Sequence, residues 1–376
     1  MLVTPRGAGG LRDSLPRPRS LRRSPIPARL ARVNERGRYA CQIKLPAWGG
    51  PEGQARLQQA TVVIVGVGAT GSAIAETLAR AGVGTLRLID RDVLEPSNLQ
   101  RQALYDEEDL ASGLPKAALA ERRLRRINGE VSVEARVSDL HAGNVGELLD
   151  GADLVLDGTD NFLTRFVIND ACLRAGVPWI YAGVVGTEVH GFPVLPGEAC
   201  FRCYLGEPPP PGTTETCQTA GVLGPAVMVA AGYAAAEALK LLVKGPADAA
   251  RGLFLTDVWT REGRRIRVSQ DPECPACAGR YEFLDAPREG HAELCGQDAV
   301  ALRPPGGKAA VLDLELLAGK LVSLGALETR NRFLLRFAPS DAPELQLTLF
   351  SDGRALVKGT VDPGAARSAY AKYVGT

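Results

Sequence analysis

Histidine, methionine and aromatic residues are scarce in this chain of 376 residues, which holds three His, two Met and 5% aromatic residues. So few histidines argue against a His-rich catalytic metal site. No apolar run reaches the roughly eighteen residues of a membrane-spanning helix, and the formal net charge is only +1. We therefore expect a soluble, cytoplasmic protein that enters no membrane and is not built mainly to hold nucleic acid.

Cysteine is also sparse, with eight residues in the whole chain. That number is too low for a disulfide scaffold in a chain of this length. Four of the eight form two Cys-X-X-Cys pairs, Cys200 with Cys203 and Cys274 with Cys277. Four thiolates suit a tetrahedral Zn²⁺ in a closed, structural site, and a redox pair is the competing interpretation.

The length of the chain allows one large domain and a smaller one. Residues 1–33 are rich in Arg, Pro and Gly, and they lack the apolar segment of a secretory signal. An organelle transit peptide is an alternative, but the prolines interrupt an amphipathic helix. We predict a disordered basic tail, or an over-long gene start, at 1–33, a large domain at 34–280 and a small C-terminal module at 281–376.

A glycine-rich turn between a strand and a helix is the most informative stretch. Residues 61–65 form an apolar, β-branched run, as a strand buried on both faces requires. Gly66, Gly68 and Gly71 follow, ahead of a helix predicted over 69–81. The first Gly permits a tight turn, the second lets backbone N–H groups approach a phosphate, and the third lets the helix pack close to the strand. The turn is predicted to bind a nucleotide phosphate.

A second strand, predicted over 85–89, ends in Asp90, which is placed to bind a ribose hydroxyl. A dinucleotide-dependent dehydrogenase carries the same glycines and the same acid, so this pattern leaves that class open. Residues 97–102 then add Ser-Asn-Leu-Gln-Arg-Gln, a polar cluster that a dinucleotide fold does not need. Arg101 suits a triphosphate, because a planar guanidinium pairs with phosphate oxygens in two-point contact.

Strands and helices alternate through the rest of the large domain, which predicts an α/β, doubly wound, Rossmann-like sheet that is mostly parallel. Ligands on such a sheet lie at the C-terminal strand ends, where Asp160 is found. A carboxylate there can hold Mg²⁺, and a helix N-cap is its alternative role. The predicted parallel strands continue at 131–137, 153–157 and 179–185, and the predicted antiparallel extension covers 186–195, 252–259 and 264–269.

Residues 207–218 form a Pro-, Gly- and Thr-rich loop that carries Cys217 just before a long helix predicted over 222–242. The first turn of a helix favours a thiolate, and a spare loop thiol is the alternative. Beyond residue 280 the pattern predicts a small α+β module in which Asp352-Gly353 marks a hairpin turn. Its predicted strands are 298–302, 332–338, 344–350 and 355–358, and its predicted helices are 312–324 and 363–374.

The order and spacing of these motifs resemble the ThiF/MoeB/HesA adenylyltransferases, bacterial relatives of the ubiquitin-activating enzymes. The resemblance covers roughly residues 38–280, and it continues to the C-terminus in the longer bacterial ThiF-like proteins. The resemblance rests on the glycine turn, Asp90-Arg91-Asp92, the 97–102 loop, Leu114-Pro115-Lys116, Asp157-Gly158-Thr159-Asp160-Asn161 and the two cysteine pairs.

The resemblance implies ATP-dependent adenylation of the C-terminal glycine of a ubiquitin-like sulfur-carrier protein of the ThiS or MoaD type, ending in Gly-Gly. A cysteine desulfurase or a rhodanese would donate the sulfur. The thiamine thiazole pathway is expected, and molybdopterin synthesis, tRNA thiolation and an RNA-acting carboxylate-activating relative are the alternatives. An NAD-dependent dehydrogenase and a non-catalytic scaffold are the remaining interpretations.

Residue roles follow from the same resemblance. A homodimer is implied, in which the segment at Arg38 reaches over the nucleotide site of the partner subunit. The family usually has a second Arg where this chain has Cys41, so either Arg38 or Arg36 supplies that charge or adenylation is slow. The implied catalytic residues are Cys217, Arg101, Lys116, Asp160 and Arg38. The implied nucleotide ligands are Gly66, Gly68, Gly71, Asp90, Asp92, Ser97, Asn98, Leu99, Gln100, Arg101, Gln102, Lys116, Asp160 and Asn161, with Mg²⁺ on Asp160 and Zn²⁺ on the four paired cysteines.

Overall fold

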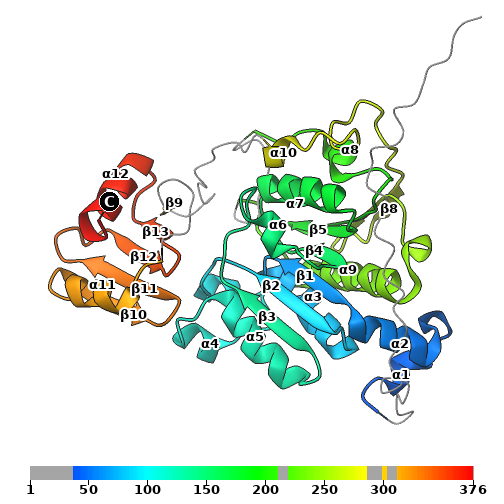
Figure 1. Cartoon of the computed structure of the whole chain (residues 1–376), viewed down its shortest axis with the longest axis horizontal. Helices are drawn as coiled ribbons and strands as arrows, with labels where there is room; N and C mark the ends of the chain where they lie inside the picture. The colour runs from blue at the N-terminus through cyan, green and yellow to red at the C-terminus, as the bar shows by residue number, and fades with distance from the viewer. Residues whose placement is uncertain (1–36, 211–218, 286–298, 303–310, 376) are drawn as a thin grey trace, which may run out of the picture.

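The computed structural model describes residues 37–210, 219–285, 299–302 and 311–375, so the predicted tail and Cys217 lie outside the described residues. Two separate sheets organise the chain (Figure 1). The large sheet has eight strands: β1 Thr61–Val65, β2 Thr85–Ile89, β3 Ser132–Arg136, β4 Leu154–Asp157, β5 Trp179–Val185, β6 Glu188–Val194, β7 Leu253–Asp257 and β8 Gly263–Ile266. The helices of this part are α1 Ala40–Ile43, α2 Gly50–Gln59, α3 Ala69–Ala81, α4 Glu107–Ala111, α5 Lys116–Ile127, α6 Val145–Leu148, α7 Phe162–Ala175, α8 Phe201–Leu205, α9 Gly224–Lys244 and α10 Glu282–Asp285.

The strand order of the large sheet is β3-β2-β1-β4-β5-β6-β7-β8. The first five strands in this order pair in parallel, and the pairs from β5 to β8 are antiparallel. The prediction of a large, mostly parallel sheet with an antiparallel extension is therefore confirmed. Because the chain winds outward in both directions from β1, the loops after β1 and β4 meet at one edge of the sheet.

Helices cover both faces of the parallel strands. On one face, alternate side chains of β1 and β4, including Ile64 and Leu156, pack against α3, α5 and α9. On the other face, Val63 and Val155 pack against α7. Both faces of these strands are therefore buried, which explains their continuous apolar, β-branched sequences.

The long helix α9 is the one element in the described part of the chain with the length and mean hydropathy of a membrane-spanning helix. Of its most apolar window, 61% is buried inside the protein. Its alanine-rich face, with Ala231, Ala234 and Ala238, packs closely on α3 and the sheet. The alanine-rich composition of this core helix permits such close packing, because small side chains let two helices approach each other.

The C-terminal module forms its own five-stranded antiparallel sheet in the order β10-β11-β12-β13-β9. Its elements are β9 Ala299–Leu302, α11 Leu314–Leu321, β10 Gly325–Arg330, β11 Leu334–Pro339, β12 Gln346–Phe350, β13 Ala355–Lys358 and α12 Pro363–Tyr373. Helices α11 and α12 pack on one face of the sheet around Phe337 and Leu347. The predicted α+β module and its hairpin at Asp352-Gly353 are borne out by the pairing of β12 with β13.

Strand β10 was not predicted from the sequence. It lies at the edge of the small sheet, its residues alternate between half-buried and exposed, and its pairing with β11 is irregular between Leu327 and Thr329. An edge strand that buries so little apolar surface carries only a weak alternation in its sequence.

Asp170 is a buried carboxylate that joins α7 to α10, and its titration gives a test of this packing. Oδ2 accepts a hydrogen bond from the backbone N–H of Phe283 at 3.0 Å. Burial raises the pKa of Asp170 to about 6 from the ordinary value of 3.8. The stability linked to this raised pKa is fully present below the unfolded pKa, and it is lost as the pH rises through about 6.

We therefore expect wild-type protein to lose up to about 3 kcal/mol of unfolding free energy, relative to Asp170→Asn, between pH 4 and pH 7.5. The asparagine side chain cannot ionise, so the variant lacks this contribution to the pH dependence. Urea unfolding of both proteins across this pH range measures the difference. Parallel pH profiles for the two proteins would contradict the expectation.

Candidate active site

The turn between β1 and α3 has a geometry that only glycine allows at two of its positions. Gly66 has a φ of +81°, and a Cβ atom there would lie 2.6 Å from the carbonyl oxygen of Gly158. A Cβ atom at Gly71 would lie 1.8 Å from the carbonyl oxygen of Gly66. This close approach sets the N-terminus of α3 directly beside the ends of β1 and β4. The turn therefore offers helix N-terminal N–H groups to an anion.

Asp90, at the end of β2, is tied to this turn through both of its carboxylate oxygens. Oδ2 accepts from the backbone N–H of Val67 and Oδ1 from that of Asp92, each at 2.7 Å. Burial, and then the negative charge of Asp92, raise the pKa of Asp90 to about 6. The carboxylate predicted to bind ribose thus lies at the turn and also holds its backbone in place.

Lys116 lies in the first turn of α5 and is 6% exposed. Its Nζ is 3.5 Å from Oδ2 of Asp92, and its backbone N–H donates to the carbonyl oxygen of Asp92 at 2.8 Å. Burial works to lower the pKa of Lys116, but the charges of Asp92, Asp90 and Asp160 outweigh it and raise the pKa. The lysine is therefore a stable, buried cation among three carboxylates.

A second cation in the same place, Arg91, was not assigned a role from the sequence. Its guanidinium pairs with Asp139 at 3.1 Å. Burial works to lower the pKa of Arg91, but the charges of Asp139, Asp92 and Asp160 outweigh it and raise the pKa. The signal for this residue is its position between the two acids of the Asp-Arg-Asp run, because a half-buried arginine balances the charge of neighbouring carboxylates.

Asp160 and its neighbour Asn161 begin α7 in different ways. Asn161 is the N-cap, since its Oδ1 accepts the backbone N–H of Thr164 at 2.8 Å. The alternative role of Asp160 as the cap is therefore wrong. The Asp160 side chain is exposed, and among the described residues its charge acts on both Lys116 and Arg91. The Asp160 carboxylate is therefore not used in capping the helix and lies at the strand end, where it could bind a cation.

A buried ion pair holds the loop that carries Asp160. Asp157 accepts the side chain of Arg165 at 2.9 Å on Oδ2, and its Oδ1 accepts both the backbone N–H and the hydroxyl of Thr159. Arg165 also donates to the carbonyl oxygen of Thr159. The sequence motif alone assigns no role to Asp157, and the structure shows that it supports this loop.

The loop over residues 97–102 starts with the short 3-10 helix η2 at Pro96–Asn98. Asn98 is buried, and its Oδ1 accepts the backbone N–H of Glu95 at 3.1 Å. The backbone N–H groups of Arg101 and Gln102 both donate to the carbonyl oxygen of Asn98. Asn98 thus fixes the shape of the loop, while Ser97 and Gln100 are exposed and Leu99 packs against the main core.

Arg101 and Gln102 end this loop with different surroundings. The Arg101 guanidinium donates to the carbonyl oxygen of Ser97 at 2.8 Å. Gln102 is 3% exposed, and its Nε2 lies 3.6 Å from the position of a Cβ atom at Gly68. Its Oε1 finds no hydrogen-bond partner among the described residues. A buried polar atom left without a partner beside the glycine turn is the feature expected of a ligand-binding residue.

The four paired cysteines meet between α8 and the segment before α10. Their sulfur atoms all lie within 4.8 Å of one another, and three of the separations are 3.8, 3.7 and 3.5 Å. A tetrahedral Zn²⁺ with Zn–S bonds of about 2.3 Å holds its sulfurs about 3.8 Å apart. The backbone N–H of Asp271 also donates to the Cys203 sulfur at 3.4 Å. The residues present therefore fit a zinc ion, and no disulfide joins the described cysteines.

Arg38 lies far from the glycine turn of its own chain. Its guanidinium donates to the carbonyl oxygen of Ile127, at the C-terminal end of α5, at 3.2 Å. The adjacent Tyr39 ring packs against Gly82, which ends α3, whereas the turn precedes the start of α3. Thirteen helical residues separate the two ends, a length of about 20 Å. Arg38 and the exposed Cys41 therefore do not contact the glycine turn of the same chain.

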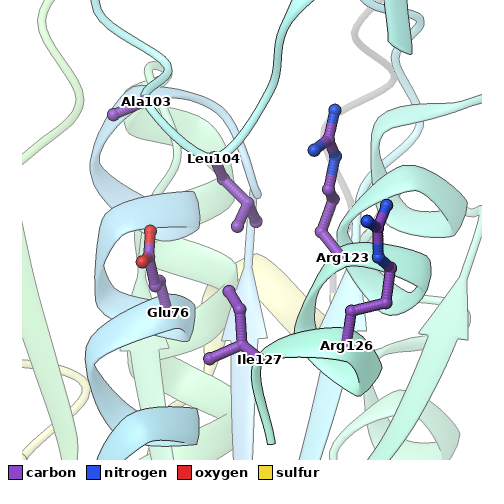
Figure 2. A pocket seen from close by; sticks show the side chains of 6 residues that line it. All are labelled: Glu76, Ala103, Leu104, Arg123, Arg126 and Ile127. Atoms are coloured by element: carbon purple, nitrogen blue, oxygen red, sulfur yellow. The ribbon is translucent and has the colours of Figure 1, made fainter. Parts of the chain in front are cut away.

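A surface cavity of about 320 Å³ lies between α3 and α5. Figure 2 shows Glu76 on α3 across from Ile127, Arg123 and Arg126 on α5, with Leu104 between the two helices. Arg123 is already paired with Asp106 and Asp109. None of the predicted nucleotide ligands lines this cavity, so it is separate from the candidate site.

Comparison with known proteins agrees with this geometry. The sulfur carrier protein ThiS adenylyltransferase of Bacillus subtilis is 42% identical over 344 residues, which are 90% of this chain and 99% of that protein. The sulfur carrier protein adenylyltransferase of Thermus thermophilus is 41% identical, over 65% of this chain and 91% of that protein. The crystal structure of E. coli MccB with ATP is similar at a TM-score of 0.57 and 25% identity, over 65% of this chain and 75% of that one.

A family model extends this agreement beyond single relatives. The model of the ThiF family matches residues 39–276. That range begins just before α1, includes the glycine turn and every other predicted nucleotide ligand, and reaches into the second cysteine pair. Because the match spans more than half of the sequence, the chain belongs to the ThiF family.

Proposed function

We propose that this protein is an adenylyltransferase that uses MgATP to activate the C-terminal glycine of a ubiquitin-like sulfur-carrier protein. The observation that carries the proposal is the cluster of Lys116, Arg91 and Asp160 beside the glycine turn, with the unpartnered Oε1 of Gln102 next to it. The names of the relatives from B. subtilis and T. thermophilus, both sulfur-carrier adenylyltransferases, support the same substrate.

The proposed reaction joins a carboxylate to AMP. The carrier's terminal carboxylate attacks the α-phosphorus of ATP, the bond to the pyrophosphate oxygen breaks, and an acyl-adenylate and pyrophosphate result. The N–H groups of the glycine turn, Lys116 and Arg101 stabilise the charge that develops on the phosphate oxygens. Asp90 holds the ribose, and Asp160 would hold Mg²⁺, which offsets phosphate charge when bound.

Sulfur transfer follows activation in this proposal, because the adenylate makes an unreactive carboxylate attackable by sulfur. Cys217 is the proposed carrier of a thioester or persulfide, with a cysteine desulfurase or rhodanese as the sulfur donor. The match to the B. subtilis relative covers 90% of the chain and so reaches into the C-terminal module. That extent favours the thiamine thiazole pathway over molybdopterin synthesis or tRNA thiolation.

The proposed assembly is a cytoplasmic homodimer. Arg38 lies at the end of α3 opposite to its own glycine turn, so it can serve only the nucleotide site of another copy. We divide the chain into the tail at 1–33, the adenylation domain with a structural zinc at 34–280 and the C-terminal module at 281–376. The zinc ion would tie the segment after β8 to α8, near the end of the large sheet.

Exchange of labelled pyrophosphate into ATP tests the function directly. We expect exchange by the purified protein that requires a Gly-Gly-ending carrier, because the acyl-adenylate must form before it can be reversed. A carrier lacking its last glycine is the matched control and should give none. Absence of exchange with every Gly-Gly-ending carrier of the source organism would refute the proposal, and binding of NADH would favour a dehydrogenase instead.

Replacement of Lys116 tests its proposed contact with the phosphates. We expect Lys116→Met to slow carrier-dependent exchange by about 100-fold, as loss of one preorganised group that stabilises charge does. The exposed Lys320 on α11 gives the control variant Lys320→Met, which should exchange at the wild-type rate. An unchanged rate in folded Lys116→Met, judged by circular dichroism, would remove this residue from the mechanism.

Removal of metal tests the cysteine site. We expect one zinc ion per chain by elemental analysis, and a strong chelator should lower the melting temperature by more than about 10 °C, because structural zinc contributes directly to folding. Cys277→Ser should lose the metal, whereas Cys172→Ala, which changes a buried cysteine outside the cluster, should keep it. Protein that contains no zinc and is indifferent to the chelator would exclude a structural zinc site.

A further inference from the structure

Among the described residues, hydrogen bonds and an ion pair join the C-terminal module to three loops of the large domain, all on the side of the glycine turn. Lys358, the last residue of β13, forms an ion pair with Glu95. The Asn331 side chain donates to the carbonyl oxygen of Gly113 at 3.1 Å, and the Arg354 guanidinium donates to that of Val137 at 3.2 Å. Glu95 follows β2, Val137 follows β3, and Gly113 precedes α5. Figure 1 shows the module beside this part of the large domain.

The contact with Glu95 leads directly to the nucleotide loop. Glu95 is the residue before η2, and its backbone N–H donates to Oδ1 of Asn98. The carbonyl oxygen of Asn98 then accepts the N–H groups of Arg101 and Gln102. A force on Glu95 is therefore transmitted through one buried asparagine to both residues that end the loop. The two side chains of the ion pair are only 33% and 28% exposed, so solvent screens it less than a surface pair.

The contact with Gly113 leads to the lysine of the site. Only two residues separate Gly113 from Lys116, and Val93 forms a β-bridge with Pro115 between them. The module packs tightly here, since a Cβ atom at Gly113 would lie 2.7 Å from a methyl carbon of Thr329. The loops that carry Arg101, Gln102 and Lys116 are thus both held from the same side by one module.

The third contact adds charge. Arg354 is held by Asp352 at 2.6 Å and stacks over Phe350. Burial works to raise the pKa of Asp92, but the charges of Lys116, Arg91 and Arg354 outweigh it and lower the pKa. The module therefore places a fixed cation close enough to act on a carboxylate of the nucleotide site.

We propose that the C-terminal module is a positioning element of the nucleotide site, in which Lys358, through Glu95, and Asn331, through Gly113, fix the loops that grip the triphosphate. The inference rests on the proposed function and assigns the module a role in ATP binding. The module touches no reacting atom in this arrangement. Its loss would loosen the site, so it acts on the affinity for ATP more than on the chemical step.

Charge reversal at the ion pair separates this role from simple structural support. We expect Lys358→Glu to raise the KM for ATP in the exchange assay about tenfold, with kcat within about threefold of wild type. Lys358→Arg should behave as wild type. The swapped pair, Lys358→Glu with Glu95→Lys, should recover most of the affinity, because the attraction is restored with the opposite polarity.

A matched control lies in the same module. Lys372 pairs with Asp341 of the same module, so Lys372→Glu breaks an ion pair within the module and not one to a loop of the large domain. It should leave the KM for ATP unchanged. Calorimetric titration with MgATP provides a second readout that does not depend on a carrier or on turnover.

Two outcomes would overturn the inference. Folded Lys358→Glu with an ATP affinity within twofold of wild type would do so, and so would a swapped pair no better than the single variant. The swapped pair also covers the case in which Lys358→Glu fails to fold. Wild-type protein that binds no ATP would instead refute the proposed function, so the two failures are distinguishable.

Discussion

The need to keep charges of both signs buried next to one glycine turn constrains this whole part of the structure. Lys116 and Arg91 stay ionised with little solvent because Asp90, Asp92, Asp139 and Asp160 lie around them. A buried charge without such partners costs several kcal/mol. Each partner must therefore be held in place. Two backbone N–H groups hold Asp90, the Asp157–Arg165 ion pair holds the loop that carries Asp160, and the packing of α5 positions Lys116.

The sequence predicts the parallel strands and the glycine turn well because their signals are local. A run such as Thr61–Val65 is apolar throughout because both of its faces are covered, and the strand observed there has the predicted limits. The family prediction rests on the same local motifs, and the family match confirms it. The position of Asp160 at a strand end also follows from these motifs, since the end of β4 is visible in the sequence.

The sequence could not predict contacts between distant segments. Arg91 looks like a surface residue until Asp139, from a loop forty-eight positions later, is placed beside it. The capping role of Asn161 depends on which of three adjacent polar residues turns toward the helix, and Thr159 is instead bonded to Asp157. The approach of the C-terminal module to Glu95 joins residues 263 positions apart, and no local pattern encodes it.

Charge balance also gives a physical reason for a divalent cation. Four carboxylates, Asp90, Asp92, Asp139 and Asp160, lie around the buried Lys116 and the half-buried Arg91, so these six groups together are anionic when all are ionised. A triphosphate is a polyanion and would be repelled by that excess at short range. A divalent cation held on the exposed Asp160 would offset that excess where the phosphates are proposed to lie. The N–H groups of the turn would then orient the phosphates, while such an ion and the proposed phosphate contact of Lys116 would supply the attraction.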